Sequence, residues 1–438
     1  MSAEKKRIVK RSKTNSVMEL VASRLGVTPQ ELEREVSGKC KNVLNIAGLD
    51  KAVDLFWSMI DSPVYVYCDY DCDGITSGSI ISIGCNSIGI KPHIIIPRRF
   101  TDGYGIKVKN LENMDPSGLL ITVDNGIAAN EAVDTAKEKG MKVIILDHHE
   151  ARILNGEQFL PEADVVIDPH ITEADFEDYC GAGLAYRFMR EVFAKKRRPA
   201  DLNGIMSSMI ALAAVGTVGD SVTMKAENRF LVRRGMEQIE QKRVSTGLAL
   251  LLEEMKLSDT LSVEDIAYSL VPAINAFGRL EDEGSRKVAA LLSYTGRKSD
   301  GAKNAAQIVK QMNDERKTYC KELTELAEKM VEETGQMNNS VLVLQDDRFL
   351  KGICGIIAGN LTEKYKVPSI VFGAPENGIC VGSGRSRDWC NLKAAMDKCS
   401  GLFFQYGGHP AACGASIQIE HLDTLRQTMC DLIEKVEE

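Results

Sequence analysis

One stretch, residues 64–74, constrains the fold more than any other part of the chain. It opens with the apolar run Val64–Tyr67 and then places Asp69, Asp71 and Asp73 at alternate positions before a glycine. Alternate residues of an extended chain point the same way, so we expect the three carboxylates to project towards one point. Three anions that close repel one another unless a cation lies between them. The stretch therefore predicts a strand that ends at a divalent metal site, with oxygen ligands suited to magnesium or manganese.

Two further apolar runs end in the same way. Residues 118–123 lead into Asp124, and the next run leads into Asp147, His148 and His149. In an open parallel sheet, ligands bind outside the carboxyl ends of the strands, so we expect these side chains beside the first three acids. Acids that follow strands can also simply cap helices, which is the alternative interpretation of each one. Three strands that end this way, one with a double histidine, favour the metal site.

The overall pattern predicts an α/β protein. Strands and helices alternate from residue 63 to about 170, which indicates a parallel β-sheet flanked by helices. We expect strands at Val64–Tyr67, His93–Ile96, Leu119–Val123, Lys142–Leu146 and Val165–Ile167, and helices at 76–89, 105–112 and 127–139. Residues 180–295 have a helical pattern, 298–336 a single long charged helix, and a second β/α pattern begins at 338.

Composition narrows the function classes. A chain of 438 residues is long enough for two or three domains. The formal net charge of −8 gives no global basic field, so a nucleic-acid ligand would need local positive potential or bound metal. No run of eighteen apolar residues is present, and we expect neither a membrane span nor a signal peptide. The twelve cysteines form no CxxC pair, which favours reduced thiols in a cytoplasmic protein, with packing roles for Cys68 and Cys72.

Several segments combine glycine with cationic or polar side chains, a combination that suits phosphate binding. Each is a weak signal alone, because charged surface loops are common. They are Pro97–Gly105 with Arg99 and Tyr104, Val271–Leu280 with Asn275 and Arg279, Gly382–Ser386 with Arg385, and Gly407–Gly414 with His409. We expect the second of them to interrupt the helices as a turn, in which Arg279 either pairs with a structural acid or faces a substrate anion. A helix of small residues, 210–219, ends at Asp220, a candidate late ligand of the metal site.

With these residues in place, the chain resembles the DHH phosphoesterase superfamily and, within it, the RecJ-like single-strand exonucleases with a DHHA1 domain. Four motifs carry the resemblance to the superfamily: residues 69–74, Asp124, residues 147–149 and residues 216–220. The RecJ-like features are the segments 97–105 and 274–280 and the two glycine-rich segments near the end. They follow the family's order from about residue 60 to the end of the chain.

The resemblance implies hydrolysis of phosphodiesters by an activated water at two manganese ions, with magnesium as the alternative metal. It implies release of 5′-mononucleotides from the 5′ end of single-stranded DNA. The metal ligands that it implies are Asp71, Asp73, Asp124, His148 and Asp220. Asp69 and Asp147 either ligate metal or orient the ligands, and His149 is a phosphate contact or proton donor. The substrate-binding residues that it implies are Arg99, Tyr104, Asn275, Arg279, Arg385, Ser386, Gly407, Gly408 and His409.

The resemblance also divides the chain into parts. We expect a helical lead-in with a basic tail at 1–60, a DHH catalytic domain at 61–295, a linking helix at 296–337 and a DHHA1 substrate-binding domain at 338–438. The channel between the two domains should admit a single strand and exclude a duplex. The OB-fold of full-length bacterial RecJ is not expected in this chain, which favours shorter substrates or recruitment by a single-strand-binding or replication or repair protein.

Two other functions stay open. One is an oligoribonuclease or a nucleoside 3′,5′-bisphosphate phosphatase of the same superfamily, which would act on short substrates. The other is a replication-associated binding protein that has kept the fold and lost the chemistry. Intact acids at every expected metal position favour an enzyme, because buried carboxylates without a metal are costly to hold together.

Overall fold

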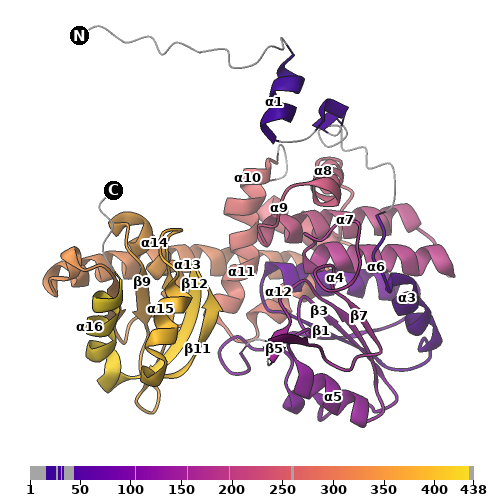
Figure 1. The fold of residues 1–438 in the computed structure, drawn as a ribbon. Coiled ribbons are helices and arrows are strands. Elements are labelled where there is room, and N and C mark those ends of the chain that lie inside the picture. The colour runs from indigo at the N-terminus through magenta and orange to yellow at the C-terminus, as the bar shows by residue number, and fades with distance from the viewer. Residues whose placement is uncertain are drawn as a thin grey trace, which may run out of the picture.

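The computed structural model describes residues 16–25, 28–30, 32–33, 44–103, 105–154, 156–196, 198–257 and 261–433. The basic tail and Tyr104, which the sequence analysis singled out, lie outside these residues. Within them the chain forms two α/β bodies joined by the long helix α13 (Asp300–Glu333) (Figure 1). The first described helix is α1 (Val17–Leu25).

The first body is built on a five-stranded sheet in the order β2-β1-β3-β4-β7, in which every neighbouring pair is parallel. Its strands are β1 (Val64–Cys68), β2 (His93–Ile95), β3 (Leu119–Val123), β4 (Lys142–Leu146) and β7 (Val165–Ile167). The predicted parallel sheet is confirmed, and β3, β4 and β7 have the predicted bounds. The carboxyl ends of all five strands therefore meet at one edge of the sheet.

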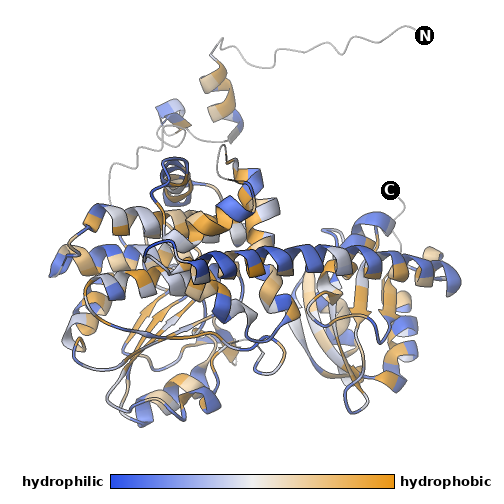
Figure 2. Cartoon of the chain, turned by 180° about the vertical axis from the view of Figure 1, so that it is seen from behind, coloured by the Kyte–Doolittle hydropathy of each residue, from blue (hydrophilic) through white to orange (hydrophobic). Residues whose placement is uncertain are grey.

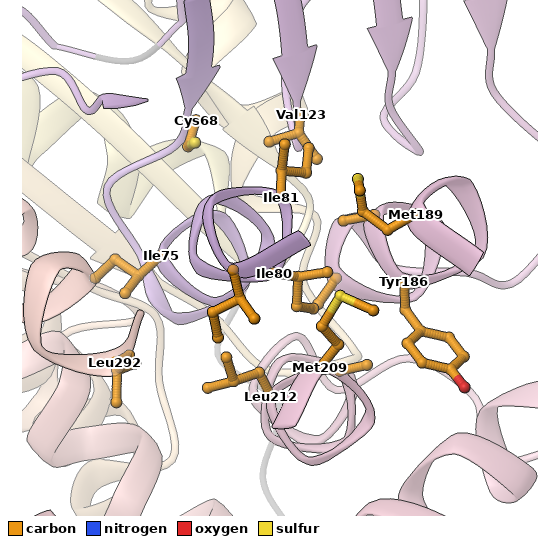
Figure 3. Packing of buried hydrophobic residues seen from close by; sticks show 14 of the residues in the cluster. Cys68, Ile75, Ile80, Ile81, Val123, Tyr186, Met189, Met209, Leu212 and Leu292 are labelled. Carbon is orange, nitrogen blue, oxygen red and sulfur yellow. The ribbon is translucent and has the colours of Figure 1, made fainter. Parts of the chain in front are cut away.

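Helices cover both faces of this sheet because its strands send alternate side chains into two apolar cores. Val66 and Cys68 of β1 enter the larger core, whereas Tyr67 enters the smaller one. The larger core contains side chains of α3 (Leu49–Ser58), α4 (Cys72–Ser87), α6 (Gly181–Lys195) and α7 (Leu202–Gly219), and the smaller one those of α5 (Asn130–Glu138). Figure 3 shows Ile80 and Ile81 of α4 between the strands and the helices α6 and α7.

Helix α7 is apolar around most of its circumference. Its length and composition would suffice to cross a membrane, but 61% of it is buried inside the protein. It packs against α4, α6 and α8 (Ala226–Glu240), so its apolar surface meets protein on several sides. The burial explains the composition as that of a central core helix.

Two helix predictions in this body are wrong. Residues 105–112 hold only the 3₁₀ turn η1 (Val108–Leu111), because Gly105 has a positive φ and the Asn110 side chain caps the backbone N–H of Lys107. The predicted turn at 271–280 is instead the helix α11 (Val271–Leu280). This helix, with its proline in the first turn, begins directly after the π-helical segment η2 (Ile266–Leu270), so the helical path continues through the residues predicted as a turn.

The remaining elements of the first body surround these. They are α9 (Thr246–Glu254), α10 (Val263–Asp265), α12 (Gly284–Leu292) and the hairpin of β5 (Arg152–Leu154) and β6 (Glu157–Phe159). The hairpin was not predicted from the sequence.

The long helix α13 connects the two bodies and packs on both. Its first half contacts α9, α11 and α12, and its second half contacts α14 and β8 of the second body. Ala306 and Val309 enter the first core, whereas Leu323, Ala327 and Val331 enter a core of the second body. Seen from behind, the helix runs across both bodies with a largely hydrophilic outer face (Figure 2). It is therefore a packed connecting helix and not a flexible linker.

The second body is a smaller α/β domain with a sheet in the order β11-β12-β10-β9-β8, in which only β8 and β9 are parallel. Its elements are β8 (Leu342–Gln345), α14 (Cys354–Tyr365), β9 (Ser369–Phe372), β10 (Ile379–Arg385), α15 (Leu392–Lys398), β11 (Phe403–His409), β12 (Ala412–Gln418) and α16 (Leu422–Leu432).

The glycine-rich segments of the second body, which the sequence suggested for phosphate binding, lie largely in strands β10, β11 and β12. Gly382 and Gly384 serve packing there, because a Cβ atom would lie 2.4 Å from the Phe372 ring and 2.7 Å from Leu392. Gly408 has a φ of 131°, and a Cβ would lie 2.4 Å from the Ala412 carbonyl oxygen. The glycines thus shape a tightly packed antiparallel sheet.

Candidate metal centre and substrate cleft

The first acidic motif is built differently from its sequence prediction. Strand β1 ends at Cys68, and Asp71 is the N-cap of α4, where its Oδ1 accepts the N–H groups of Asp73 (3.0 Å) and Gly74 (3.2 Å). Gly74 is required by a close approach, since a Cβ would lie 2.4 Å from the Asp69 carbonyl oxygen. The three acids are therefore not alternate residues of an extended strand. They follow a strand-to-helix corner, and Asp71 is a helix cap and a site residue at once.

The acids after β3 and β4 lie at the same edge of the sheet. Asp124 adopts a left-handed conformation with φ of 60°, which aspartate tolerates better than most residues, and its N–H donates to the Leu146 carbonyl at 2.9 Å. Asp147 is fully buried and its N–H donates to the Ile167 carbonyl at 2.9 Å. The sheet's own hydrogen bonding thus fixes the backbone of both motifs.

These residues converge on one centre, together with Asp220, which caps the C-terminus of α7. Three overlapping triads each bring one ligand atom per residue within 4.8 Å of the others. The triads are Asp69, Asp71 and Asp124; Asp73, His148 and Asp220; and Asp124, His148 and His149. His148 Nε2 lies 3.1 Å from Asp124 Oδ1, 3.8 Å from Asp73 Oδ2 and 3.7 Å from Asp220 Oδ2. One imidazole nitrogen therefore faces three carboxylates.

The electrostatics of this cluster call for cations. Burial raises the pKa of Asp69 and of Asp124 well above the usual range, and the charges of neighbouring acids raise both further. Burial, followed by the charge of Asp73, raises the pKa of Asp220 to about 8. Asp69 Oδ1 is buried and has no hydrogen-bond partner among the described residues. Hard divalent ions fit this donor set of several carboxylates and one neutral histidine, whose pKa burial lowers.

Asp73 is oriented by a helix terminus that the sequence analysis missed. Its carboxylate accepts the N–H of Gly181 at 2.6 Å and that of Ala182 at 2.9 Å, at the start of α6. A helix N-terminus stabilises a carboxylate through its free N–H groups and its dipole. A Cβ on Gly181 would lie 2.6 Å from the Asp124 side chain, and one on Gly216 would lie 2.8 Å from Asp73 Oδ1. Both glycines make room for the acids.

Asp147 and His149 form a separate pair beside this cluster. Asp147 accepts hydrogen bonds from His149 Nδ1 (2.8 Å) and from the N–H groups of Ile127 (2.9 Å) and His148 (2.8 Å). Its contacts suit the orienting role rather than direct ligation. His149 also has a nitrogen within 4.8 Å of the Asp124 and His148 ligand atoms. Burial lowers the pKa of His149, but the hydrogen bond to Asp147 and the charges of Asp147, Asp69 and Asp220 together outweigh it and raise that pKa to about 9.

A cavity of about 600 Å³ lies between this pair and the second body. Asp147 and His149 line one side, and Gly408 and His409 of β11 line another. Most of the remaining lining is small or aliphatic: Gly105, Ile106, Gly126, Ile127, Ala128, Ala129 and Ala151, with Lys107 and Glu150. The cavity is large enough for a mononucleotide-sized ligand, which ordinarily occupies a site of roughly 300–1,000 Å³.

Three arginines form a cationic cluster near the acids: Arg99 from the loop after β2, Arg279 from α11 and Arg385 from β10. Burial, followed by the nearby charges of Arg99 and Arg385, lowers the pKa of Arg279 to about 9. Arg99 lies over the Tyr70 ring at 4.4 Å, and its Nη1 is buried without a hydrogen-bond partner among the described residues. Within the described part of the chain, no acid lies at ion-pair distance from these three guanidinium groups. Such a cluster suits an anionic ligand, which would add to the stabilising charges of Asp69 and Asp71 nearby.

The other predicted substrate residues differ in what they contact. Ser386 Oγ donates to the Cys390 carbonyl at 2.7 Å and is thus engaged in its own loop. Asn275 Oδ1 is buried and unpartnered among the described residues, which leaves an acceptor for a ligand. His409 lines the cavity, whereas Gly407 has open space where a side chain would be. Cys68 and Cys72 are buried in the larger core, where we expected packing roles.

A fourth acid at the sheet edge was missed. Asp168 directly follows β7 and is fully buried, and its Oδ2 has no partner in the described part of the chain. Burial raises its pKa to about 7, and the charge of Asp147 adds to this effect. Its position after an apolar strand is the signal that identified the other acids, so the same rule would have found it.

Comparison with known proteins matches both bodies to families. Residues 63–217 match the family described as "DHH family, N-terminal domain", and residues 338–435 match the "DHHA1 domain". The single-stranded-DNA-specific exonuclease RecJ of Dickeya dadantii is 30% identical over 427 residues, which cover 92% of this chain and 72% of that protein. The RecJ of Escherichia coli is 29% identical and covers 94% of this chain and 74% of its own length. That of Bacillus subtilis is 31% identical, and the match spans 48% of its length.

Solved structures agree. A crystal structure of exonuclease RecJ bound to manganese superposes with a TM-score of 0.75 at 25% identity and covers 90% of this chain and 96% of that one. RecJ of Thermus thermophilus with Mn²⁺ also gives a TM-score of 0.75, at 24% identity, over 95% of this chain and 60% of that chain. The second likeness shows the shared fold.

Proposed function

The chain belongs to the RecJ family of DHH proteins, and on that premise we propose that this DHH-family nuclease removes 5′-mononucleotides stepwise from the 5′ end of single-stranded DNA. The observation that carries the proposal is the juxtaposition of an anionic and a cationic cluster. Carboxylates converge at the sheet edge, and three arginines without acid partners among the described residues lie nearby. A metal-bound scissile phosphate and an arginine-bound neighbouring phosphate would satisfy both clusters.

Two divalent ions, manganese or magnesium, would be held by Asp71, Asp73, Asp124, His148 and Asp220, with Asp69 as a further donor. When bound, such ions supply an activated water and neutralise the charge that develops on the phosphate. The protein's own part is to hold the acids rigidly: the start of α6 binds Asp73, and the sheet fixes Asp124. Asp147 orients His149, which we place as a phosphate contact or as the donor of a proton to the leaving oxygen.

The cleft supports action at the end of a single strand. Arg279 and Arg385, one from each body, would hold a phosphate next to the scissile one, with Arg99 beside them. The cavity between His149 and His409 would take the terminal nucleoside. Because α13 packs on both bodies, the width of this cleft is fixed and would exclude a duplex by sterics.

The test is digestion of a 5′-labelled, single-stranded 40-nucleotide DNA in Mn²⁺, beside a 3′-labelled copy, a duplex and an RNA of equal length. We expect labelled mononucleotide at the earliest times from the 5′-labelled DNA alone. The duplex should survive, and D124N protein should be inactive. Early release of label from the 3′ end would contradict the polarity.

The same assay, with oligonucleotides of two to five residues added as substrates, separates the alternatives. If long DNA survives while oligonucleotides of two to five residues disappear, the protein is an enzyme for short substrates, as in the oligoribonuclease interpretation. If no substrate is cleaved in Mn²⁺ or Mg²⁺ but single-stranded DNA is bound, a binding protein is supported instead.

A further inference from the structure

We infer that Asp282, in the corner between α11 and α12, is a positioning residue that holds Arg99 at the substrate phosphate, an inference that rests on the proposed function. Asp282 Oδ1 accepts the backbone N–H of Phe100 at 2.8 Å, and its Oδ2 accepts the hydroxyl of Thr101. These two residues directly follow Arg99 in the loop after β2. One carboxylate, some 180 residues away in sequence, thus anchors the loop at the point where its phosphate-binding arginine leaves the backbone.

Asp102 stiffens the loop from within. Asp102 bonds Arg98 Nε (3.2 Å) and Lys109 Nζ (2.8 Å), and its own N–H donates to the Arg98 carbonyl at 2.8 Å. All of these partners belong to the loop or to the 3₁₀ turn that follows it. The loop also meets other elements, through the Tyr67 hydroxyl on the Gly105 carbonyl (3.1 Å) and through Arg99 on the Tyr70 ring, but Asp282 holds the two residues next to Arg99, so its removal should displace Arg99.

The corner that carries Asp282 also contacts two other parts of the site. Ser285 Oγ donates to the carbonyl of Tyr70 at 2.6 Å, and the Tyr70 ring lies under Arg99 at 4.4 Å. Tyr70 stands between Asp69 and Asp71. Arg279, at the end of α11, donates to the Gly352 carbonyl of the second body at 3.2 Å. The residues 279–285 therefore connect the acid-bearing loop, the arginine loop and the second body.

This arrangement gives Asp282 a role distinct from binding. Its two oxygens are engaged by Phe100 and Thr101, and its charge is of the wrong sign to bind phosphate itself. Arg99, by contrast, has a buried Nη1 without a partner among the described residues. Asp282 would set the distance between Arg99 and Arg279, and so the place of the phosphate that both contact.

The experiment compares D282A, D282N and the neighbouring E283Q in full-length protein, with a 5′-phosphorylated single-stranded 20-nucleotide DNA in Mn²⁺. We expect D282A to raise KM about tenfold and to change kcat less than about twofold, because a displaced arginine weakens phosphate binding while the acids stay in place. D282N should restore most of the affinity, since an amide can still accept from Phe100 and donate to the Thr101 oxygen. E283Q, which removes an exposed acid beside it, should behave as wild type.

A double-mutant cycle with R99A tests whether the effect passes through Arg99. If it does, R99A and R99A/D282A should have the same KM, because Asp282 has nothing left to position. Additive effects would overturn the inference, as would a D282A protein whose KM equals that of wild type. Wild-type protein that neither binds nor cleaves single-stranded DNA would instead overturn the proposed function, and the inference with it.

Discussion

The acid cluster of the first body and the arginine cluster at the boundary of the two bodies each gather side chains of one charge, but the two clusters are built very differently. Each acid follows a strand or caps a helix of one domain, and main-chain hydrogen bonds of the sheet or a helix terminus hold it. The arginines come from a loop, from α11 and from β10 of the other body. The acid cluster is thus a property of one fold, whereas the arginine cluster exists only while two bodies and a loop stay in place.

This difference suggests that the acid cluster serves the chemistry and the arginine cluster serves substrate recognition. A centre fixed within one domain suits chemistry, which tolerates little displacement of reacting groups. A cluster assembled across a boundary suits recognition, because its geometry reports whether a strand of the right shape occupies the cleft. Changes to the acids should therefore act on kcat and metal binding, and changes to the arginines should act on KM.

The largest effect is expected from Asp124. D124N removes a charge at the centre of two triads but retains a side chain that tolerates the left-handed backbone. We expect kcat to fall by on the order of 10³-fold or more, with unchanged KM for the DNA. Single-turnover assays in saturating Mn²⁺ measure this. D164N is the matched control, since Asp164 lies before β7, where it pairs with Lys137 and Lys142, and its activity should remain near wild type.

The arginine cluster is broken by R279Q. If Arg279 binds phosphate as proposed, loss of its buried guanidinium should raise KM about 30-fold or more, with a smaller change in kcat. The Tm should not fall, because burial and the neighbouring arginines already disfavour the charge of Arg279. R348Q removes a surface arginine paired with Asp346 and serves as the control. A kcat effect as large as that of D124N would show that the two clusters do not divide their roles.

A change in packing beside the acid cluster should have a smaller effect. In G216A the new methyl group would lie 2.5 Å from the Ala182 Cβ and 2.8 Å from Asp73 Oδ1, so we expect a loss of about 1–3 kcal/mol in the free energy of unfolding and weaker Mn²⁺ binding. Gly414 of β12 has nothing within 4 Å of its Cβ direction, so G414A is the control. Denaturant unfolding and Mn²⁺ titration give both quantities. Equal behaviour of the two variants would contradict the idea that the acids are held by tight packing.

The acid cluster was largely predictable from the sequence because its geometry follows from strand ends. Asp124, Asp147 and His148 lie where the parallel sheet requires them, and the bounds of β3 and β4 were predicted to the residue. The error at 69–73 arose because the sequence there fits two local structures, a strand and the start of a helix. The alternation of acids suggested a strand, but a side chain that caps the next helix and a glycine that permits a sharp corner decided the local structure.

The arginine cluster could be named from sequence but not assembled. Glycine next to a cationic residue pointed to phosphate-binding segments, and residues 271–280 were predicted to form a turn. Tertiary packing instead makes strands of 382–385 and 407–409 and a helix of 271–280. The engagement of Ser386 with its own loop, and the anchor from Asp282, depend on contacts between distant segments that no local pattern encodes. The predicted domain boundaries and the roles of the site residues stay predictions.

The smallest expected effect is a pH dependence of stability to which the acid cluster contributes. In the metal-free folded protein the pKa of Asp220 is about 8, above its ordinary value of 3.8. Between about pH 4 and pH 8 the folded state therefore binds more protons than the unfolded state, so the stability should fall as the pH rises. Bound Mn²⁺ should reverse the trend, because metal binding requires deprotonated ligands and strengthens with pH. Calorimetry in EDTA and in Mn²⁺ at several pH values measures both slopes.

The slope in EDTA should flatten in D220N and stay unchanged in D300N, which removes an exposed acid at the start of α13. If D220N keeps the wild-type slope, Asp220 does not titrate against its acidic neighbours, and the acid cluster is looser than its geometry indicates.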